Sequence, residues 1–144
     1  MKSINPSQRR KTCDINALKK SGYLNQIEDD GCLVCCINGP KDTPYTGMKF
    51  TIRITLPFEY PFRSPSIGFI GHVFHPNVDW ESGSICLNAL NQEWTPVYNL
   101  VSIVSTLIPQ LLTYPNPEDP LNVEAAKLLQ NDIEAYKERC KQTA

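Results

Sequence analysis

The segment "MKFTIRITLP", residues 48–57, is the part of the sequence that most clearly indicates the fold. Apolar and polar side chains alternate along it, and the apolar set is Phe50, Ile52 and Ile54. A period of two residues is typical of a β-strand that has one face on the core and the other in solvent. The segment therefore predicts a half-buried strand.

Three further runs have the composition of strands: "YLNQIE" (23–28), "CLVCCING" (32–39) and "PSIGFI" (65–70). Short stretches rich in glycine, proline and aspartate separate the four runs, and such stretches are typical of turns. Connections this short favour an antiparallel meander, because parallel neighbours need long crossovers. The sequence therefore predicts a four-stranded antiparallel sheet.

Helices are expected before and after these strands. Residues 7–20 predict a first helix, and the apolar run "VYNLVSIVSTLIPQLL" (97–112) predicts a helix that lies against the sheet. Pro109 is expected to kink or tighten the last turn of that helix. Residues 123–140 predict one or two more helices. This order of helix, strands and helices indicates an α+β fold.

The length and charge of the chain narrow the function classes. With 144 residues, one domain spanning residues 1–144 is expected, and the net charge of -1 gives no field that favours nucleic acid or an anionic membrane. No apolar run approaches the roughly 20 residues of a membrane span. The basic start of the chain has no apolar stretch typical of a secretory signal behind it, so a reducing compartment and free thiols are expected.

The spacing of Cys32 and Cys35 is the Cys-x-x-Cys spacing of some zinc and redox sites. A second ligand pair at zinc spacing is missing, because the only histidines are His72 and His75. The cysteines also lie in an apolar β-like run, in which Cys35 and its neighbour Cys36 would face opposite sides of the sheet. No metal site is therefore expected.

Between residues 71 and 96 neither period persists, which predicts a long ordered loop of the kind that is usually functional. Cys86 lies in this loop, where a thiol is accessible and can act as a nucleophile. His75 is the candidate base for a catalytic Cys-His pair. Because Phe74 and Pro76 flank it in a turn-like tripeptide, a structural histidine that hydrogen-bonds the backbone is the favoured alternative.

Asn77 has two possible roles in the same loop. It is either a turn residue that caps backbone groups, or an amide donor aimed at an oxyanion near Cys86. Trp94 is expected to anchor the loop by packing, because its ring is large and apolar and only the indole N–H needs a partner.

Several motifs now occur together: "YPFRSP", "HPN", "GSICLNAL", "EW" with Thr95-Pro96, and "PNPEDPLN". In this order and spacing they resemble the ubiquitin-conjugating enzymes (E2), and most closely the H type of that family. The resemblance covers nearly the whole chain and is far more specific than any single motif. It implies the α+β ubiquitin-conjugating (UBC) fold.

The resemblance implies an acyltransferase that accepts ubiquitin from an E1 enzyme as a thioester on Cys86. An E3 ligase then directs transfer to a substrate lysine. In this family, His75 and Pro76 match residues that shape the loop, and Asn77 matches one that holds it and contributes to oxyanion stabilisation. Asp119 matches the acidic residue that orients the lysine and helps to deprotonate it. From its position alone, Asp119 could instead cap the helix expected near residue 123.

The same resemblance implies the partners, which are ubiquitin, E1, protein substrates and a RING-type E3 of the GID/CTLH kind, without nucleic acid or membrane. The E3-binding positions are Pro61, Phe62, Pro96 and Val97, and the first-helix positions that meet E1 and E3 are Arg9, Arg10 and Lys11. No cofactor is implied for this subunit, because E1 consumes the ATP. The implied location is the cytoplasm and the nucleus.

Two alternative functions stay open. The chain could conjugate another ubiquitin-like modifier, a choice that the first helix and its surroundings decide. It could also be a non-catalytic ubiquitin-binding E2 variant, although that class is marked by loss of the cysteine and Cys86 is present. The sequence departs from the family pattern at Phe74, where many E2s have tyrosine, and at Asn88, where aspartate is common.

Overall fold

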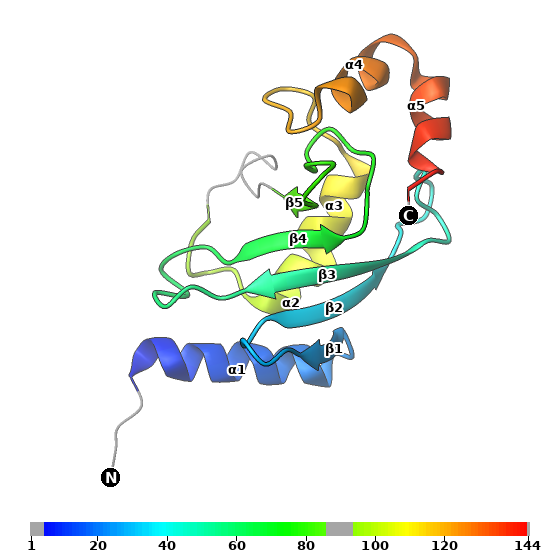
Figure 1. Ribbon diagram of the computed structural model, residues 1–144. Helices are drawn as coiled ribbons and strands as arrows, with labels where there is room; N and C mark the ends of the chain where they lie inside the picture. The colour runs from blue at the N-terminus through cyan, green and yellow to red at the C-terminus, as the bar shows by residue number, and fades with distance from the viewer. Residues whose placement is uncertain (1–4, 86–93, 144) are drawn as a thin grey trace.

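The computed structural model describes residues 5–85 and 94–143 of the chain (Figure 1). The elements in chain order are α1 (Pro6–Lys20), β1 (Leu24–Ile27), β2 (Leu33–Asn38), β3 (Lys49–Thr55), β4 (Ser66–Ile70), β5 (Ser84–Ile85), α2 (Leu100–Ser102), η2 (Ile103–Leu107), α3 (Ile108–Thr113), α4 (Val123–Asn131) and α5 (Ile133–Cys140). This is the expected α+β order. None of the described helices is long and apolar enough to cross a membrane.

The boundaries of α1 follow from its terminal residues. The side chain of Asn5 accepts a hydrogen bond from the backbone N–H of Gln8 at 2.8 Å and caps the helix. Pro6 occupies the first turn, where its missing N–H leaves no hydrogen bond unmade. After the helix, Gly22 takes a positive φ of 84°, which a glycine adopts without strain.

The sheet has the order β1-β2-β3-β4-β5 with every pair antiparallel, so the predicted meander is confirmed. The apolar side of β3 is buried as the alternation predicted, with Ile52 and Ile54 fully enclosed. The number of strands was wrong, because β5 adds a fifth inside the segment expected to be irregular. Two residues are too few to show a period, so the sequence could not reveal this strand.

One glycine fixes the entry into β5. Gly83 has a φ of 78°, and its carbonyl accepts a hydrogen bond from the N–H of Phe69 in β4 at 2.8 Å. A Cβ at position 83 would lie 2.0 Å from the carbonyl oxygen of Phe69, closer than any side chain allows. Only glycine therefore fits at this position, and β5 is held against β4.

The segments α2, η2 and α3 follow one another as a continuous helical stretch that crosses one face of the sheet (Figure 1). It begins at Leu100, three residues later than predicted (100 − 97), because Asn99 and Ser102 form a reciprocal capping box. Of the two effects expected of Pro109, a kink or a tightened turn, the tightened turn was wrong. The turn before it is widened instead into the π-helical η2, in which the N–H of Ile108 reaches the carbonyl of Ile103. A wider turn accommodates the proline ring, which would otherwise press on the carbonyl of the preceding turn.

The carboxyl-terminal part forms two helices, as one of the two alternatives predicted. Asp132 separates them and caps α5 by accepting a hydrogen bond from the N–H of Ala135 at 3.1 Å. Figure 1 shows α4 and α5 at the end of the molecule opposite α1. The inner side of α5 is buried, and the Tyr136 and Cys140 side chains meet the hydroxyl of Tyr45, both at 3.4 Å.

Candidate active site

The His75 ring is completely buried, and both of its nitrogens are used within the protein. Nε2 donates to the carbonyl of Leu111 at 2.7 Å, and Nδ1 accepts from the backbone N–H of Asn77 at 3.0 Å. Burial lowers the pKa of His75 from 6.5 to about 4, since the charged ring would lose its hydration. This neutral ring joins the loop to α3 and has no nitrogen left for a thiol, so the geometry favours the structural interpretation.

Asn77 is also buried, and its side-chain amide pairs with a single backbone unit. Its Nδ2 donates to the carbonyl of Asn116 at 2.7 Å, while its Oδ1 accepts from the N–H of Asn116 at 2.8 Å. Such a two-way pair fixes the orientation of the amide, because the donor and acceptor ends are both matched. Asn77 therefore holds the segment 113–122 in place, whatever else it does.

Pro76 strengthens the same connection through its carbonyl oxygen. That oxygen accepts the N–H of Leu121 at 2.8 Å and the N–H of Asn122 at 3.0 Å. Pro76 itself is buried. The His75–Asn77 tripeptide is thus fastened to residues 111, 116, 121 and 122, far along the chain, and acts as the hub of the site.

Asp119 projects from this fastened segment into solvent. It has a φ of 49°, a left-handed conformation that aspartate tolerates better than most residues. The helix cap of α4 is Asn122, whose side chain accepts the N–H of Ala125 at 3.0 Å. The capping alternative for Asp119 is therefore wrong, and its exposed carboxylate is accessible to an incoming group.

The predicted nucleophile, Cys86, lies outside the described residues. The residue before it in the chain, Ile85, is paired with Ile67 of β4 and bridged to Val78. Val78 directly follows Asn77 in the sequence. The backbone that leads into residue 86 is therefore held beside the end of the tripeptide by the sheet.

Trp94 packs between the two segments that carry the predicted E3-binding residues. Its indole N–H donates to the carbonyl of Pro61 at 2.8 Å, and its ring centroid lies 6.0 Å from that of Tyr60 and 5.7 Å from that of Tyr98. Pro61 itself is buried, and the peptide bond before it is cis. Of the predicted E3-binding residues, Pro61 therefore contributes to the conformation of its loop and does not present accessible surface.

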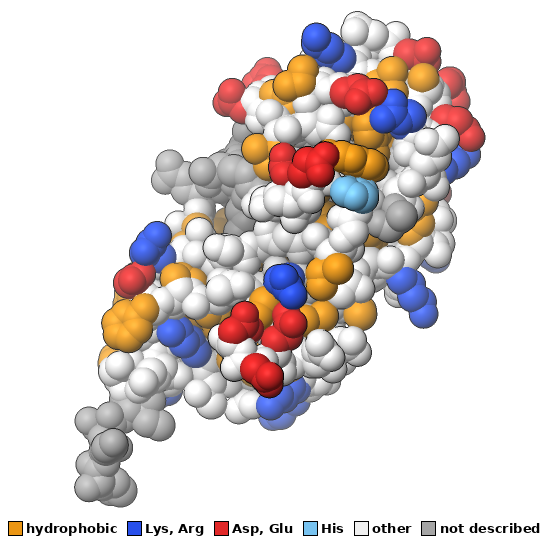
Figure 2. Space-filling model, in the orientation of Figure 1, with side chains coloured by type: hydrophobic (Ala, Val, Ile, Leu, Met, Phe, Trp, Pro, Cys, Tyr) orange, Lys and Arg blue, Asp and Glu red, His pale blue; other side chains and the backbone are white. Residues whose placement is uncertain are grey.

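The other predicted E3-binding side chains are open to solvent. Phe62 is 70% exposed and Val97 is 86% exposed, and Pro96 is exposed beside it. Figure 2 shows hydrophobic side chains at the surface over the loop between β3 and β4, with basic and acidic groups around them. Exposed apolar side chains gathered in this way are typical of a protein-binding surface.

The three predicted basic residues of α1 have different surroundings. Arg9 is exposed, whereas Arg10 pairs with Asp14 at 2.9 Å. The ammonium of Lys11 donates to the carbonyl of Phe58 at 3.3 Å and lies over its ring. Of these three cations, only Arg9 is exposed, and Arg10 and Lys11 are half-buried.

The cysteine cluster has the predicted facing. Cys35 is buried, and Cys36 is exposed on the other side of β2. The described residues do bring ligand atoms of Glu28, Asp30 and Cys32 within 4.8 Å of one another. Two of these groups have protein partners, since Glu28 pairs with Arg53 at 2.9 Å and Asp30 accepts the N–H of Cys32 at 2.9 Å. These contacts of Glu28 and Asp30 explain why the three groups lie close together, as parts of a turn with an ion pair.

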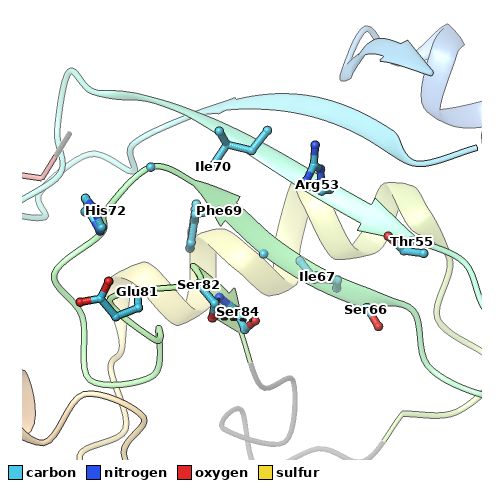
Figure 3. Close-up of a pocket in the computed structure, with 12 residues that line it drawn as sticks. Arg53, Thr55, Ser66, Ile67, Phe69, Ile70, His72, Glu81, Ser82 and Ser84 are labelled. Carbon is cyan, nitrogen blue, oxygen red and sulfur yellow. Dashed lines mark hydrogen bonds between the residues drawn. The ribbon is translucent and has the colours of Figure 1, made fainter. Parts of the chain in front are cut away.

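A pocket of about 440 Å³ opens over β3, β4 and the turn before β5 (Figure 3). Arg53, His72, Glu81 and Ser84 are among its lining residues. The His75–Asn77 tripeptide and Asp119 do not line it. This pocket is therefore separate from the described residues of the candidate active site.

Two residues of the site were missed in the sequence. Asn116 supplies the backbone partner of Asn77, a pairing across 39 positions that no local pattern indicates. Asn122 caps α4, and its place directly before a helical run was a recognisable cap signal.

Comparison with known proteins now identifies the family. A family model described as ubiquitin-conjugating enzyme matches residues 7–144. The chain is 47% identical over 139 residues to ubiquitin-conjugating enzyme E2 5 of Arabidopsis thaliana, which covers 95% of this chain and 75% of that protein. It is 43% identical over 141 residues to ubiquitin-conjugating enzyme E2-24 kDa of Saccharomyces cerevisiae, and the match covers 96% of this chain and 65% of that protein.

Solved structures agree with the fold. The E2 domain of a Toxoplasma gondii ubiquitin-conjugating enzyme superposes with a TM-score of 0.81 at 31% identity, covering 94% of each chain. The H. polymorpha ubiquitin-conjugating enzyme Pex4p, solved in complex with the soluble domain of Pex22p, gives a TM-score of 0.84 at 27% identity with the same coverage. Motifs, fold and family match agree, and this chain belongs to the ubiquitin-conjugating enzymes, the E2 transferases of ubiquitin conjugation.

Proposed function

We propose that Cys86 is the residue on which this E2 enzyme carries ubiquitin as a thioester, and that it passes the ubiquitin to a substrate lysine. The supporting observation is the fastening of the His75–Asn77 tripeptide to the segment that bears Asp119. Two groups suited to lysine attack, an amide and a carboxylate, are thereby held on one frame. The strand that leads to Cys86 is bridged to the same frame at Val78.

The chemistry needs few groups. Charging exchanges one thioester for another of similar energy, so the Cys86 sulfur replaces the E1 sulfur at the ubiquitin carbonyl without a strong resident base. Aminolysis then forms an amide bond, breaks the carbon–sulfur bond and releases the Cys86 thiolate. The tetrahedral oxyanion formed on the way requires a donor, for which the second hydrogen of the Asn77 amide is suited.

Asp119 acts on the amine that attacks. Its negative charge alone would raise the pKa of a lysine, which opposes deprotonation. Its role is therefore to orient the ammonium and to accept the proton as the carbon–nitrogen bond forms. Pro117 and Pro120 restrict the backbone around it, so little entropy is lost when the carboxylate meets the lysine.

The decisive experiment is incubation with E1, ATP and a panel of ubiquitin-like modifiers, followed by gels run with and without reductant. Ubiquitin should form a reductant-sensitive adduct, Cys86→Ser a reductant-stable ester, and Cys86→Ala no adduct. Cys36→Ala is the matched control, because Cys36 is an exposed thiol on β2. An adduct on Cys86→Ala would refute the assignment, and charging by another modifier alone would favour the alternative E2 class.

The proposed partner for transfer is a RING-type E3 ligase of the GID/CTLH kind, which docks on Phe62, Pro96 and Val97. The exposure of these three side chains supports the proposal. Phe62→Ala should charge normally and lose ligase-stimulated discharge. Equal stimulation of the variant and the wild type would rule out this surface. The proposed setting is the cytoplasm and nucleus, with no cofactor bound by this subunit.

A further inference from the structure

One face of α1 is polar where an amphipathic helix usually turns apolar residues inward. Ser7, Arg10, Lys11 and Asp14 recur at intervals of three and four residues, so they share one side of the helix. All four contact residues far along the chain, either in the loop 57–63 or in the segment 94–98. We call these four residues the α1 polar stripe. It faces the two segments that bear the proposed ligase-binding side chains.

Arg10 is the member of the α1 polar stripe that joins both segments. Its Nε donates to Asp14 Oδ2 at 2.9 Å, and its Nη2 donates to the carbonyl of Tyr98 at 2.5 Å. Its guanidinium also lies 5.9 Å from the centroid of the Tyr60 ring. A planar guanidinium is the side chain suited to such simultaneous contacts, because its donors point in several fixed directions.

Asp14 completes the connection to the loop 57–63. Its carboxylate is buried, and the same Oδ2 that accepts from Arg10 also accepts from the hydroxyl of Tyr60. Burial, and then the hydrogen bond to Asp14, raise the pKa of the Tyr60 phenol, so the phenol keeps its proton and acts as the donor. Ser7 adds hydrogen bonds to the carbonyls of Phe58 and Tyr60.

The exposed ends of the two segments depend on this frame. Phe58 and Phe62 lie on either side of the buried Tyr60 and are 81% and 70% exposed. Val97 precedes Tyr98, whose carbonyl Arg10 holds, and is 86% exposed. Trp94, at the start of the segment 94–98, also joins it to the loop 57–63 through its hydrogen bond to Pro61. Arg10 and Trp94 are therefore two ties between segments whose tips are apolar and open to solvent.

We infer that Arg10 is a positioning residue that sets the spacing of the loop 57–63 and the segment 94–98, and so the affinity for the E3 ligase, rather than a direct contact of E1. This assignment rests on the proposed docking of a ligase at Phe62, Pro96 and Val97. It separates Arg10 from Arg9, the neighbouring cation that is displayed to solvent. Arg10 uses two of its five N–H donors on Asp14 and Tyr98 and is only partly exposed, so it is less available to a partner than Arg9.

The first test is independent of any ligase. The indole N–H proton of Trp94 gives an NMR signal that reports its bond to Pro61, and Trp80 gives an internal reference. Arg10→Gln should move the Trp94 signal and leave the Trp80 signal in place, whereas Arg9→Gln should move neither. An unmoved Trp94 signal in Arg10→Gln would overturn the inference.

The second test compares Arg10→Gln with Lys19→Gln, a change of an exposed cation on the same helix, over a titration of the ligase. In Arg10→Gln the ligase concentration for half-maximal discharge should rise about tenfold, the loss expected for a charge-assisted hydrogen bond, while the maximal rate persists. The E2 concentration for half-maximal charging by E1 should shift more in Arg9→Gln than in Arg10→Gln. The reverse pattern, with Arg10→Gln defective in charging alone, would assign Arg10 to E1.

Further variants separate this inference from the docking proposal. Arg10→Lys, which keeps the charge but loses the fork, should recover part of the ligase affinity, and Asp14→Asn should resemble Arg10→Gln. If Phe62→Ala weakens the ligase and Arg10→Gln does not, the positioning role alone is wrong. If Phe62→Ala has no effect, the docking surface itself is wrong. Should Arg10→Gln fail to fold, the titration of Arg10→Lys carries the same decision, with unchanged affinity overturning the role.

Discussion

Asn77 belongs to the His75–Asn77 tripeptide, and its side chain also holds the backbone of Asn116 through two hydrogen bonds. Its amide has two hydrogens, of which the hydrogen bond to Asn116 uses one. Loop holding and oxyanion stabilisation are therefore compatible, because they draw on different atoms of the same group. They have different consequences when the residue is changed.

Asn77→Ser should slow single-turnover discharge onto free lysine by about 100-fold or more, the usual effect of losing one oxyanion donor. Charging by E1 should be affected much less, since thioester exchange is nearly balanced in energy. The melting temperature should also fall, because the clamp on Asn116 is lost. A variant that melts earlier yet discharges at the normal rate would reduce Asn77 to a holder.

His75 makes the stability of the protein depend on pH. Its pKa is lowered from 6.5 to about 4 in the folded state and returns to its ordinary value on unfolding. Between these pH values the unfolded chain binds a proton that the folded chain does not. The free energy of unfolding attributable to His75 therefore falls as the pH falls from 6.5 to 4, by about 3 kcal/mol in total.

Urea unfolding at a series of pH values measures this dependence. The slope between pH 6.5 and 4 should be shallower in His75→Asn than in the wild type. His72→Gln is the matched control, because His72 is exposed and is the only other histidine. Identical slopes in wild type and His75→Asn would show that the ring takes up its proton in the folded state.

At the scale of single elements, the start of α4 and the acidic residue before it have separate tasks. Asn122 caps the helix, and Asp119 stands three positions earlier with a left-handed backbone. Asn122→Ala should lower the free energy of unfolding by about 1 kcal/mol, the usual worth of such a cap. Asp119→Asn keeps a side chain that tolerates this backbone and should melt near the wild type.

In catalysis the order reverses, and Asp119→Asn should be impaired more than Asn122→Ala. Discharge onto lysine should slow in Asp119→Asn, and least at high pH, where free amine is plentiful. The discharge rate per folded molecule should fall less in Asn122→Ala. Thermal melts and a pH series of discharge on both variants test these separate roles. A loss of stability in Asp119→Asn as large as that in Asn122→Ala would contradict them.

Elements with a clear local signal were predictable, and those that depend on distant partners were not. The alternation around Ile52 and the helical pattern of residues 7–20 are local, and both elements were confirmed. The strand β5 depends on Gly83 fitting against Phe69, and η2 depends on how Pro109 packs in its helix. Neither signal exists within a short window of sequence.

The candidate site shows the same division. The motifs around His75 and Asp119 could be found in the sequence, and the structural interpretation of the histidine was favoured from its neighbours. The pairing of Asn77 with Asn116, and the inward orientation of Arg10, depend on the tertiary fold. A basic run on a helix has the same sequence pattern whether its members face solvent or another segment.

For the whole molecule, the thiols give a test of the packing. Cys13 and Cys36 are exposed, while Cys32, Cys35 and Cys140 are buried. Burial raises the pKa of Cys35 to about 12 and also raises that of Cys140, so both stay protonated and unreactive at neutral pH. In a Cys86→Ala background, two of these five thiols should react rapidly with a thiol reagent in the native state.

Denaturant should release the remaining three thiols, and mass spectrometry of the labelled peptides identifies which ones reacted first. Fast labelling of Cys35 or Cys140 in the native protein would mean that the core opens readily. Protection of Cys36 would mean instead that the outer face of β2 is covered in solution, for example by a second copy of the chain.

The contacts of Phe74 also have a consequence for the order in which a ribosome completes this enzyme. Its N–H donates to the Thr143 hydroxyl at 3.0 Å, and its carbonyl accepts from the Cys140 thiol at 3.4 Å. Translation adds these two partners at the very end of the described chain, long after β1 to β4 have been made. The peptide in front of His75 therefore lacks two of its partners until synthesis reaches residue 143, although the residues that fasten the His75–Asn77 tripeptide, at positions 111, 116, 121 and 122, are made earlier.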